Sequence, residues 1–235
     1  MAESTDTIHQ TQVLAALFSP SFPIGAFSYS HGIEVAIASG DVANASTAYD
    51  WIDTILRAGS GRNDAILMAN AYKAVYPHAT KDGDLASGRN SQIEVINELA
   101  FALSPGAERA QESCELGINF TRVLKQVYEL DIGLSPPLAY PVAAGLAARN
   151  LGCELRLSLS FFLQSFVGNL ISVAVRAVPV GQSDGQIILV RLMPDTAALA
   201  DEAATTTLSD VGGYAILADH ASILHETLET RIYRT

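Results

Sequence analysis

The sequence predicts an all-α fold, a single globular helical-bundle domain of about ten helices. Three observations support this class. Apolar residues recur at helical spacing through most of the chain, prolines and glycines separate these segments, and the connections between them are short. No internal repeat or low-complexity linker divides the 235 residues. We therefore expect a flexible N-terminal tail at 1–10 and one domain at 11–235, which ends in a C-terminal docking tail.

In the first half of the chain, breakers and caps define the expected helices. Val13 begins a short apolar helix that stops before Pro20, and the polar, glycine-containing segment 81–90 is typical of a mobile loop. The expected helices of this half are 13–18, 28–39 closed by Gly40, 45–58 capped by Ser46 and ended by Gly59, 64–76 capped by Asp64, and 93–103.

The second half of the chain holds longer helices. Pro105 suits the first turn of a helix. Ser113 and Gly117 then place two small side chains on one face of that helix, where another helix can approach closely. The expected helices of this half are 106–130, 138–150, 154–178 and 211–232.

One segment of the second half resists a helical interpretation. Runs rich in β-branched residues at 171–180 and 187–193 flank the dipeptide Asp184-Gly185. Such a dipeptide between such runs is typical of a β-hairpin. The residues alone leave a hairpin and a helical connection equally open.

The segment 157–175 carries no charged residue and is long enough to cross a membrane. Its polar residues fall on one stripe of a helix, which favours a buried helix of a globular domain, and we expect no membrane association. The stripe either forms ordinary interhelical hydrogen bonds or lines a polar, water-filled path for ions. It comprises Ser158, Ser165, Asn169, Ser172 and Arg176.

Charge and cysteine content narrow the classes of function. The formal net charge is −11 and no basic cluster occurs, which argues against nucleic-acid binding because phosphates require neutralisation by cations. Charged residues make up only 17% of the chain, so apolar surface is expected at contacts with partners. Two unpaired cysteines, Cys114 and Cys153, and a polar N-terminus predict a cytoplasmic protein.

Catalytic motifs are sparse. The sequence contains neither Gly-x-Ser-x-Gly nor a phosphate-binding glycine-rich loop. Glu112 and Glu115 are better explained as a solvated helix face than as an acid–base pair. The alternative to a non-catalytic protein is a small metal-dependent hydrolase that uses His220, His225 and Glu226, although tight metal sites need three or four ligands.

Two segments near the chain ends carry unusual polar groups. At 19–34, prolines and a glycine form an elbow, followed by a helix whose first turn carries Tyr29, Ser30 and His31. A simple helix cap explains this elbow equally well. The chain end at 225–235 is basic and aromatic in an acidic protein, which is more consistent with docking onto another surface.

Four motifs together resemble the urease accessory protein F (UreF) family. The first is the elbow at 19–34, Ser-Pro…Pro-Ile-Gly-Ala-Phe-Ser-Tyr-Ser-His-Gly-Ile-Glu, and the second is Glu108-Arg109…Ser113…Gly117. The third, at 176–186, is Arg-Ala-Val-Pro-Val-Gly-Gln-Ser-Asp-Gly-Gln, and the fourth, at 225–235, is His-Glu-Thr…Arg-Ile-Tyr-Arg-Thr. The motifs occur in order, so the resemblance covers about residues 12–235.

The resemblance implies a single all-α domain that forms homodimers, with 181–186 as a helix–helix connection. It implies a non-catalytic adaptor that couples the urease accessory D/H protein to the GTPase G protein while nickel is inserted into apo-urease. No cofactor or metal site is implied for this chain, since the nickel ligands would belong to the GTPase.

We expect the elbow and the tail to be partner surfaces, because aromatic and arginine side chains suit interface anchors. The predicted partner-binding residues are Phe27, Tyr29, Ser30, His31, Glu34, Arg176, Gln182, Gln186, His225, Glu226, Arg231, Tyr233 and Arg234.

Overall fold

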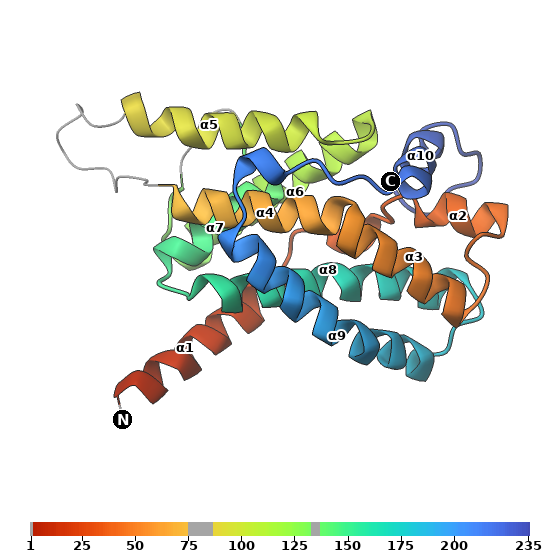
Figure 1. Cartoon of the computed structure of the whole chain (residues 1–235), viewed down its shortest axis with the longest axis horizontal. Coiled ribbons are helices and arrows are strands. Elements are labelled where there is room, and N and C mark those ends of the chain that lie inside the picture. Colours follow the sequence, from red (N-terminus) through yellow and green to blue (C-terminus); the bar gives the residue numbers. More distant parts are fainter. Residues whose placement is uncertain (1, 75–86, 133–136) are drawn as a thin grey trace.

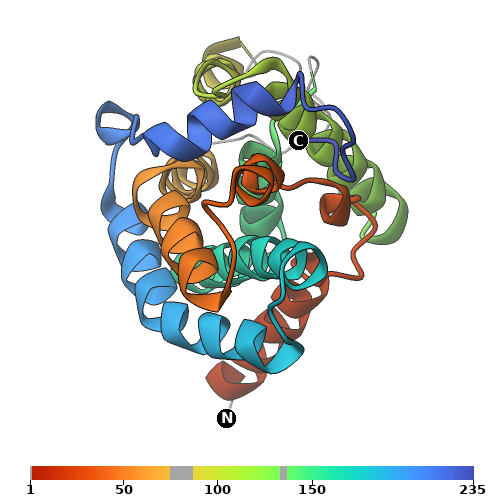
Figure 2. The ribbon, with the colours of Figure 1, turned by 90° about the vertical axis from the view of Figure 1, so that its right-hand side faces the viewer.

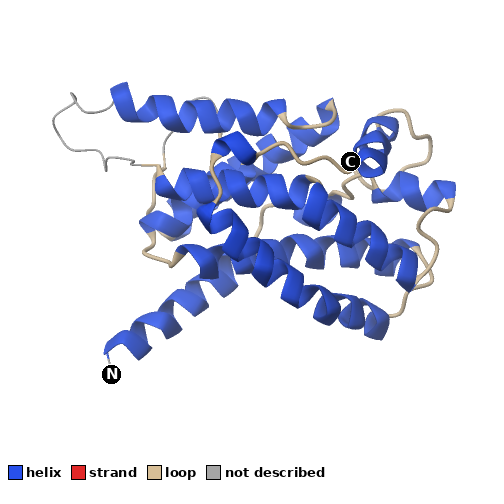
Figure 3. Ribbon diagram, viewed as in Figure 1, coloured by secondary structure: helices blue, strands red, loops and turns tan. Residues whose placement is uncertain are grey.

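The computed structural model describes residues 2–74, 87–132 and 137–235, and these residues form only helices and loops (Figures 1 and 3). The predicted all-α class is therefore confirmed. Two short 3₁₀ helices, η1 and η2, accompany the α-helices. The elements are α1 (Ala2–Leu17), η1 (Ala26–Ser28), α2 (Ile33–Ser39), α3 (Ala45–Ala58), α4 (Ser60–Lys73), α5 (Ser87–Ala102), α6 (Ala107–Val127), α7 (Tyr140–Asn150), α8 (Leu155–Ala177), α9 (Gln182–Thr205), η2 (Leu208–Asp210) and α10 (Ile216–His225).

Helix α8 lies at the centre of the bundle, where it packs against α1, α2, α3, α4, α7 and α9 (Figure 2). By length and composition it is the one described helix that is able to cross a membrane. However, its apolar side chains are used inside the protein: Leu159, Leu163 and Val167 are fully buried. Burial in the core accounts for its composition, as expected for the central helix of a bundle.

Aromatic rings join the N-terminal elbow to the middle of the bundle. Phe18 stacks on Phe120 at a centroid distance of 6.5 Å and meets Phe162 edge-on at 5.9 Å. Phe22 and Tyr140 also pack against Phe120, at 5.3 and 5.4 Å. Such ring pairs stabilise a core beyond the area that they bury. The elbow is therefore anchored to α6, α7 and α8.

Small residues let α7 pack closely against α6 and α4. A Cβ atom at Gly117 would lie 1.9 Å from the carbonyl oxygen of Leu138, and one at Gly145 would lie 2.3 Å from that of Met68. The Ser113 hydroxyl accepts a hydrogen bond from the Tyr140 amide at 3.3 Å. The predicted close approach at Ser113 and Gly117 is therefore confirmed.

Helix α1 differs from the expected short helix at 13–18, since it begins at Ala2. Residues 2–10 of the expected tail are helical, and Asp6 accepts a hydrogen bond from Gln10 at 3.1 Å. Gln10 in turn accepts one from the Glu154 amide at 3.0 Å, next to the start of α8. Polar i,i+4 pairing and this tertiary contact extend the helix through a segment without apolar periodicity.

The helix after the elbow begins later than the expected residue 28. Tyr29 is extended, and His31 and Gly32 have φ angles of 53° and 76°, so α2 starts only at Ile33. A Cβ atom at Gly32 would also lie 2.7 Å from the Ser222 amide nitrogen, so this left-handed position requires glycine. Tyr29, Ser30 and His31 therefore lie in a loop and not in a first helical turn.

Two predicted helix caps are wrong. Asn44, and not Ser46, caps α3, because its side chain accepts from the amides of Ser46 and Thr47 at 2.9 and 3.2 Å. Asp64 lies inside α4, which begins directly after Gly59. The expected start of α3 at residue 45 is correct, whereas α4 begins at Ser60, four residues before Asp64. Residues 75–76 of the expected helix 64–76 and residues 81–86 of the expected loop 81–90 lie outside the described residues. Residues 87–90 of that expected loop belong instead to α5.

The β-hairpin hypothesis for 171–193 is wrong. Residues 178–181 connect α8 to α9, and the expected connection 182–186 instead forms the first turns of α9. Asp184 accepts a hydrogen bond from the Gly181 amide at 3.0 Å, which caps the helix. Burial of α8 against α9 overrides the β propensity of their branched residues.

The last helix is shorter than the expected 211–232. Only Ile216–His225 is helical, as α10, and the preceding residues run through η2 and an extended segment. Residues 226–235 continue as a non-helical tail that returns to the elbow, so the C-terminus lies between α10 and the body of the bundle (Figure 1).

Candidate partner-binding site

The C-terminal tail folds onto the elbow through backbone hydrogen bonds. The Ser30 amide donates to the carbonyl of Thr235 at 2.8 Å, and the Arg234 amide donates to that of Ser28 at 2.8 Å. The Ser30 hydroxyl also bonds to the Thr235 carbonyl, across a separation of 205 residues in sequence. Thr235 and Tyr233 are buried. The two ends of the domain thus form one structural unit.

Glu34, in the first turn of α2, holds the tail in place. Its carboxylate accepts hydrogen bonds from the amides of Ile232 and Tyr233, at 2.6 and 3.0 Å. The same carboxylate accepts from Nε2 of His225 at 3.0 Å. The side chain is buried, so these three donors replace the water that a carboxylate requires.

His225, at the end of α10, is completely buried between two carboxylates. Its Nε2 faces Glu34, and its Nδ1 lies 2.7 Å from Oε2 of Glu108 on α6. Each ring nitrogen therefore has a carboxylate partner within hydrogen-bond distance. Arg231 of the tail pairs with the other oxygen of Glu108. Glu108 thus contacts both the last residue of α10 and the C-terminal tail.

A second buried ion cluster adjoins the first. Glu112, which is 1% exposed, pairs with Arg109 and lies 2.9 Å from Nε2 of His31. It also accepts a hydrogen bond from the Thr235 hydroxyl at 2.8 Å. Burial alone would raise the pKa of Glu112, but Arg109 and His31 together lower it to about 2. Burial and Arg109 lower the pKa of His31.

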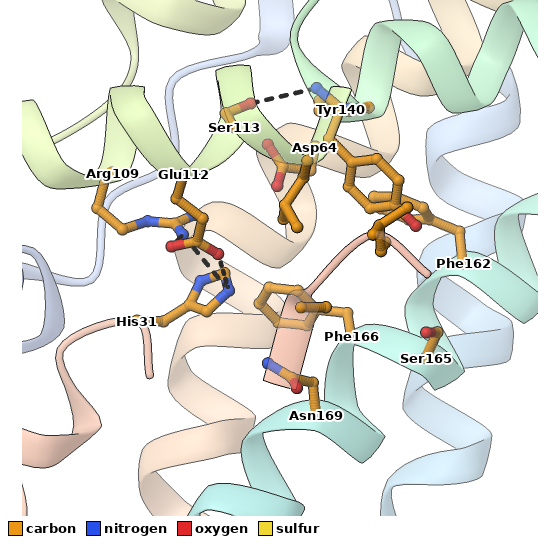
Figure 4. Close-up of a pocket in the computed structure, with 14 residues that line it drawn as sticks. His31, Asp64, Arg109, Glu112, Ser113, Tyr140, Phe162, Ser165, Phe166 and Asn169 are labelled. Atoms are coloured by element: carbon orange, nitrogen blue, oxygen red, sulfur yellow. Dashed lines mark hydrogen bonds and ion pairs between the residues drawn. The ribbon is translucent and has the colours of Figure 1, made fainter. Parts of the chain in front are cut away.

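A cavity of about 60 Å³ adjoins this buried pair, and Figure 4 shows Asp64 and Tyr140 facing Glu112 and His31 around it. Within the described part of the chain, the Asp64 carboxyl takes part in no hydrogen bond or ion pair. Burial raises the pKa of Asp64 to about 7, with a further increase from Glu112 and an opposing effect of Arg109. The cavity is therefore lined by one carboxyl whose pKa is raised and one whose pKa is lowered.

The polar stripe of α8 runs from the interior of the bundle to its surface. Ser165 and Asn169 line the cavity, and Asn169 donates to the carbonyl of Tyr29 at 3.3 Å. Ser158 is buried and bonds to the Glu154 carbonyl within its own helix. Ser172 and Arg176 are exposed. Local hydrogen bonding thus accounts for Ser158 and Asn169.

The outer rim of the site is aromatic and basic. Arg234 bonds to both oxygens of Glu115 at 2.7 and 2.9 Å, and the Tyr29 hydroxyl donates to Glu115 at 2.7 Å. The Arg176 guanidinium lies 5.2 Å from the ring centroid of Tyr233 and donates to the Phe27 carbonyl. Cation–π and bidentate contacts of this kind orient arginine at a surface.

The structure brings most of the predicted site residues together. We call this assembly the elbow–tail cluster; it comprises Phe27, Tyr29, Ser30, His31, Glu34, Glu108, Arg109, Glu112, Glu115, Arg176, His225 and residues 231–235. Glu226 lies beside it and accepts from the Ala107 amide at 2.7 Å. Gln182 and Gln186 are exposed on the first turns of α9, and their side chains form no hydrogen bond with described residues.

Sequence reasoning missed the acidic partners on α6. Glu112 and Glu115 were expected on a solvated face, yet Glu112 is buried and Glu115 binds the tail. The spacing Glu108, Glu112, Glu115 places three carboxylates along one helical face, and this was the available signal. Of the residues named for the alternative hydrolase, His220 is exposed, and both nitrogens of His225 face carboxylates. Within the described residues no group of three His, Cys, Asp or Glu is placed to hold a metal.

The fold and the site define a class: an all-α helical bundle whose C-terminal segment closes over its own N-terminal elbow. The UreF family model matches residues 42–193. The chain is 39% identical to the urease accessory protein UreF of Ruegeria pomeroyi, over 99% of this chain and 100% of that protein. It is 39% identical to that of Bradyrhizobium diazoefficiens over 94% and 90%, and 41% identical to that of Cereibacter sphaeroides over 94% and 97%. The chain belongs to the UreF family of urease accessory proteins.

Proposed function

We propose that this protein is a non-catalytic adaptor in urease maturation, where it couples the accessory D/H protein and the GTPase G protein during nickel insertion into apo-urease. In this proposal it acts as a cytoplasmic homodimer, and nickel is cargo and not a resident cofactor. Membership of a urease accessory family supports a role in urease maturation. The finer assignment depends on the elbow–tail cluster.

The observation that carries the proposal is the division of the cluster into a paired interior and an exposed apolar rim. Inside, the charged groups pair with one another, which suits a rigid scaffold better than a reaction centre. At the rim, Phe27 is 65% exposed and Ile232 is 80% exposed, beside Arg231 and Arg234. Exposed apolar side chains next to arginines are typical anchors of a protein interface.

An apolar stripe on α9 supports the homodimer. Ile187, Val190 and Met193 are 57%, 60% and 42% exposed at successive turns of this helix. Homodimer contacts are more apolar than the remaining protein surface, and this stripe supplies such a face.

Co-purification with the D/H and G partners tests the proposal. We expect the double variant Phe27→Ser/Ile232→Ser to retain less of the D/H partner and to activate urease poorly, because both side chains are exposed and carry no buried contact. Val127→Ser is the matched control, since Val127 is 67% exposed on α6 but lies outside the cluster. Equal retention of the D/H partner and equal nickel-dependent urease activation by the unsubstituted protein and both variants would contradict the proposal.

A further inference from the structure

A groove lies between α3 and the segment that leads into α10, and it shares no lining residue with the elbow–tail cluster. Its volume is about 540 Å³, which is within the usual range of binding pockets. We call it the Trp51 groove and define it by Asp41, Asp50, Trp51, Tyr214, Ile216 and Leu217.

One wall of the Trp51 groove is unusually apolar for an exposed surface. Tyr214, Ile216 and Leu217 are 69%, 68% and 71% exposed, and all three lie close together along the chain. Single exposed apolar side chains are ordinary, whereas a contiguous set beside a groove marks a contact with another molecule. Trp51 forms the opposite wall, and its Nε1 is buried without an acceptor among the described residues.

The charged groups of the groove are all acidic. Asp41 and Asp50 line it, and neither forms an ion pair within the described part of the chain. Lysine and arginine do not occur among its lining residues. By contrast, the carboxylates of the elbow–tail cluster are matched by Arg109, Arg231 and Arg234. The Trp51 groove therefore has apolar contact area together with uncompensated negative charge.

We propose that the Trp51 groove binds a segment of a partner protein in which bulky apolar side chains are flanked by lysine or arginine. The apolar wall accommodates the bulky side chains, and Asp41 and Asp50 select the cations. This proposal is independent of the function assigned to the elbow–tail cluster.

A second copy of this chain is a poorer occupant than a basic partner. The chain has 14 lysine and arginine residues against 25 aspartate and glutamate residues, so a second copy offers few cations to this groove. The basic tail does not supply free cations either, because Arg231 and Arg234 are already paired with Glu108 and Glu115. Charge complementarity therefore favours a different protein with a basic, apolar segment.

The chain offers a direct probe, because Trp51 is its single tryptophan. We would titrate the full-length ¹⁵N-labelled protein with a synthetic peptide of alternating leucine and lysine, and follow the indole N–H cross-peak of Trp51. A leucine–glutamate peptide of equal length is the control ligand. We expect a saturable shift of this cross-peak with the lysine peptide, and no shift with the glutamate peptide.

Paired variants separate a specific site from general attraction to an acidic protein. The double variant Asp41→Asn/Asp50→Asn should lower the affinity for the lysine peptide about tenfold, since each exposed ion pair contributes a modest amount of binding free energy. Glu94→Gln/Glu98→Gln removes the same charge from exposed positions on α5 and should leave the affinity unchanged. Leu217→Ser should weaken binding by about tenfold or more. All the substituted side chains are exposed, and circular dichroism verifies the fold of each variant.

Three results would overturn the proposal. The first is a Trp51 cross-peak that does not move when the peptide is bound, because the peptide would then lie elsewhere. The second is an equal loss of peptide affinity in the two double variants, because net charge alone would then explain the binding. The third is a Trp51 cross-peak that moves when the protein alone is diluted, together with loss of this change in Leu217→Ser. That result would assign the groove to a second copy of the chain.

Discussion

The elbow–tail cluster and the Trp51 groove lie at opposite ends of α10 in sequence, and they use charge in opposite ways. At the cluster, His225 and the arginines of the tail meet carboxylates inside the protein. At the groove, Asp41 and Asp50 face outward beside exposed apolar side chains. Paired buried charge specifies one arrangement of the chain. Unpaired surface charge beside apolar area instead leaves binding capacity for another molecule.

The largest effect is expected from removing a buried charge in the cluster. Glu112→Gln leaves the Arg109 guanidinium buried without its counter-ion, so the free energy of unfolding should fall by about 3–5 kcal/mol. Urea denaturation measures this change. Glu115→Gln is the control, because its pair with Arg234 is half-exposed and should contribute about 1 kcal/mol or less. Equal losses in the two variants would remove the distinction between interior and rim.

An intermediate effect is expected at Asp64, and it depends on pH. Its pKa is raised in the folded protein from 3.8 to about 7, so the folded state binds this proton more tightly than the unfolded state. The resulting stability is complete below pH 3.8 and is lost as the pH rises through 7. We expect the free energy of unfolding of the unsubstituted protein to fall by about 2 kcal/mol between about pH 5 and about pH 8 because of this group. The variant Asp64→Asn should not show this fall.

Thermal unfolding across this pH range measures the effect, with Asp184→Asn, an exposed helix cap, as the control. A pH profile of the Asp64 variant that is parallel to that of the unsubstituted protein would contradict the assignment. Glu112 has the opposite sign: its pKa of about 2 lies below the ordinary 4.5, so its contribution is present above pH 4.5 and is lost towards pH 2.

The smallest effect on stability is expected at the Trp51 groove. Asp41→Asn/Asp50→Asn and Leu217→Ser should each change the unfolding free energy by about 0.5 kcal/mol or less, because these side chains are exposed. The same variants are expected to weaken peptide binding. A large loss of stability in either variant would show that the groove is a structural contact of the bundle and not a vacant binding surface.

The sequence predicted the helices that depend on local signals. The helix 45–58, its end at Gly59 and the close approach at Ser113 and Gly117 follow from periodicity, breakers and small residues, and all are confirmed. The residues alone could not decide between a hairpin and a helical connection at 171–193, because burial between α8 and α9 is a tertiary effect that propensity does not include. The start of α2 was missed because His31 adopts a left-handed φ of 53°, which is uncommon for a residue with a side chain.

The candidate site was only half visible in the sequence. The elbow and the tail each stood out through aromatic and basic residues at chain ends, but nothing local joined them. Glu34 and His225 are 191 residues apart and meet only because α2 and α10 pack together. Glu112 and Glu115 were expected on a solvated helix face for the same reason. Ion pairs between residues so far apart in sequence depend on how the helices pack together. The spacing of residues along one helix does not reveal this packing.

The central claim is that the elbow and the tail form one folded unit in the free protein. Amide hydrogen exchange at Ile232 and Tyr233 tests it most directly, because both amides donate to the buried Glu34 carboxylate. We predict that both amides are protected in the unsubstituted protein and exchange about tenfold faster or more in Glu34→Ala, as expected for the loss of a buried acceptor. Exchange of both amides at the rate of an unstructured peptide, in the unsubstituted protein, would contradict the claim.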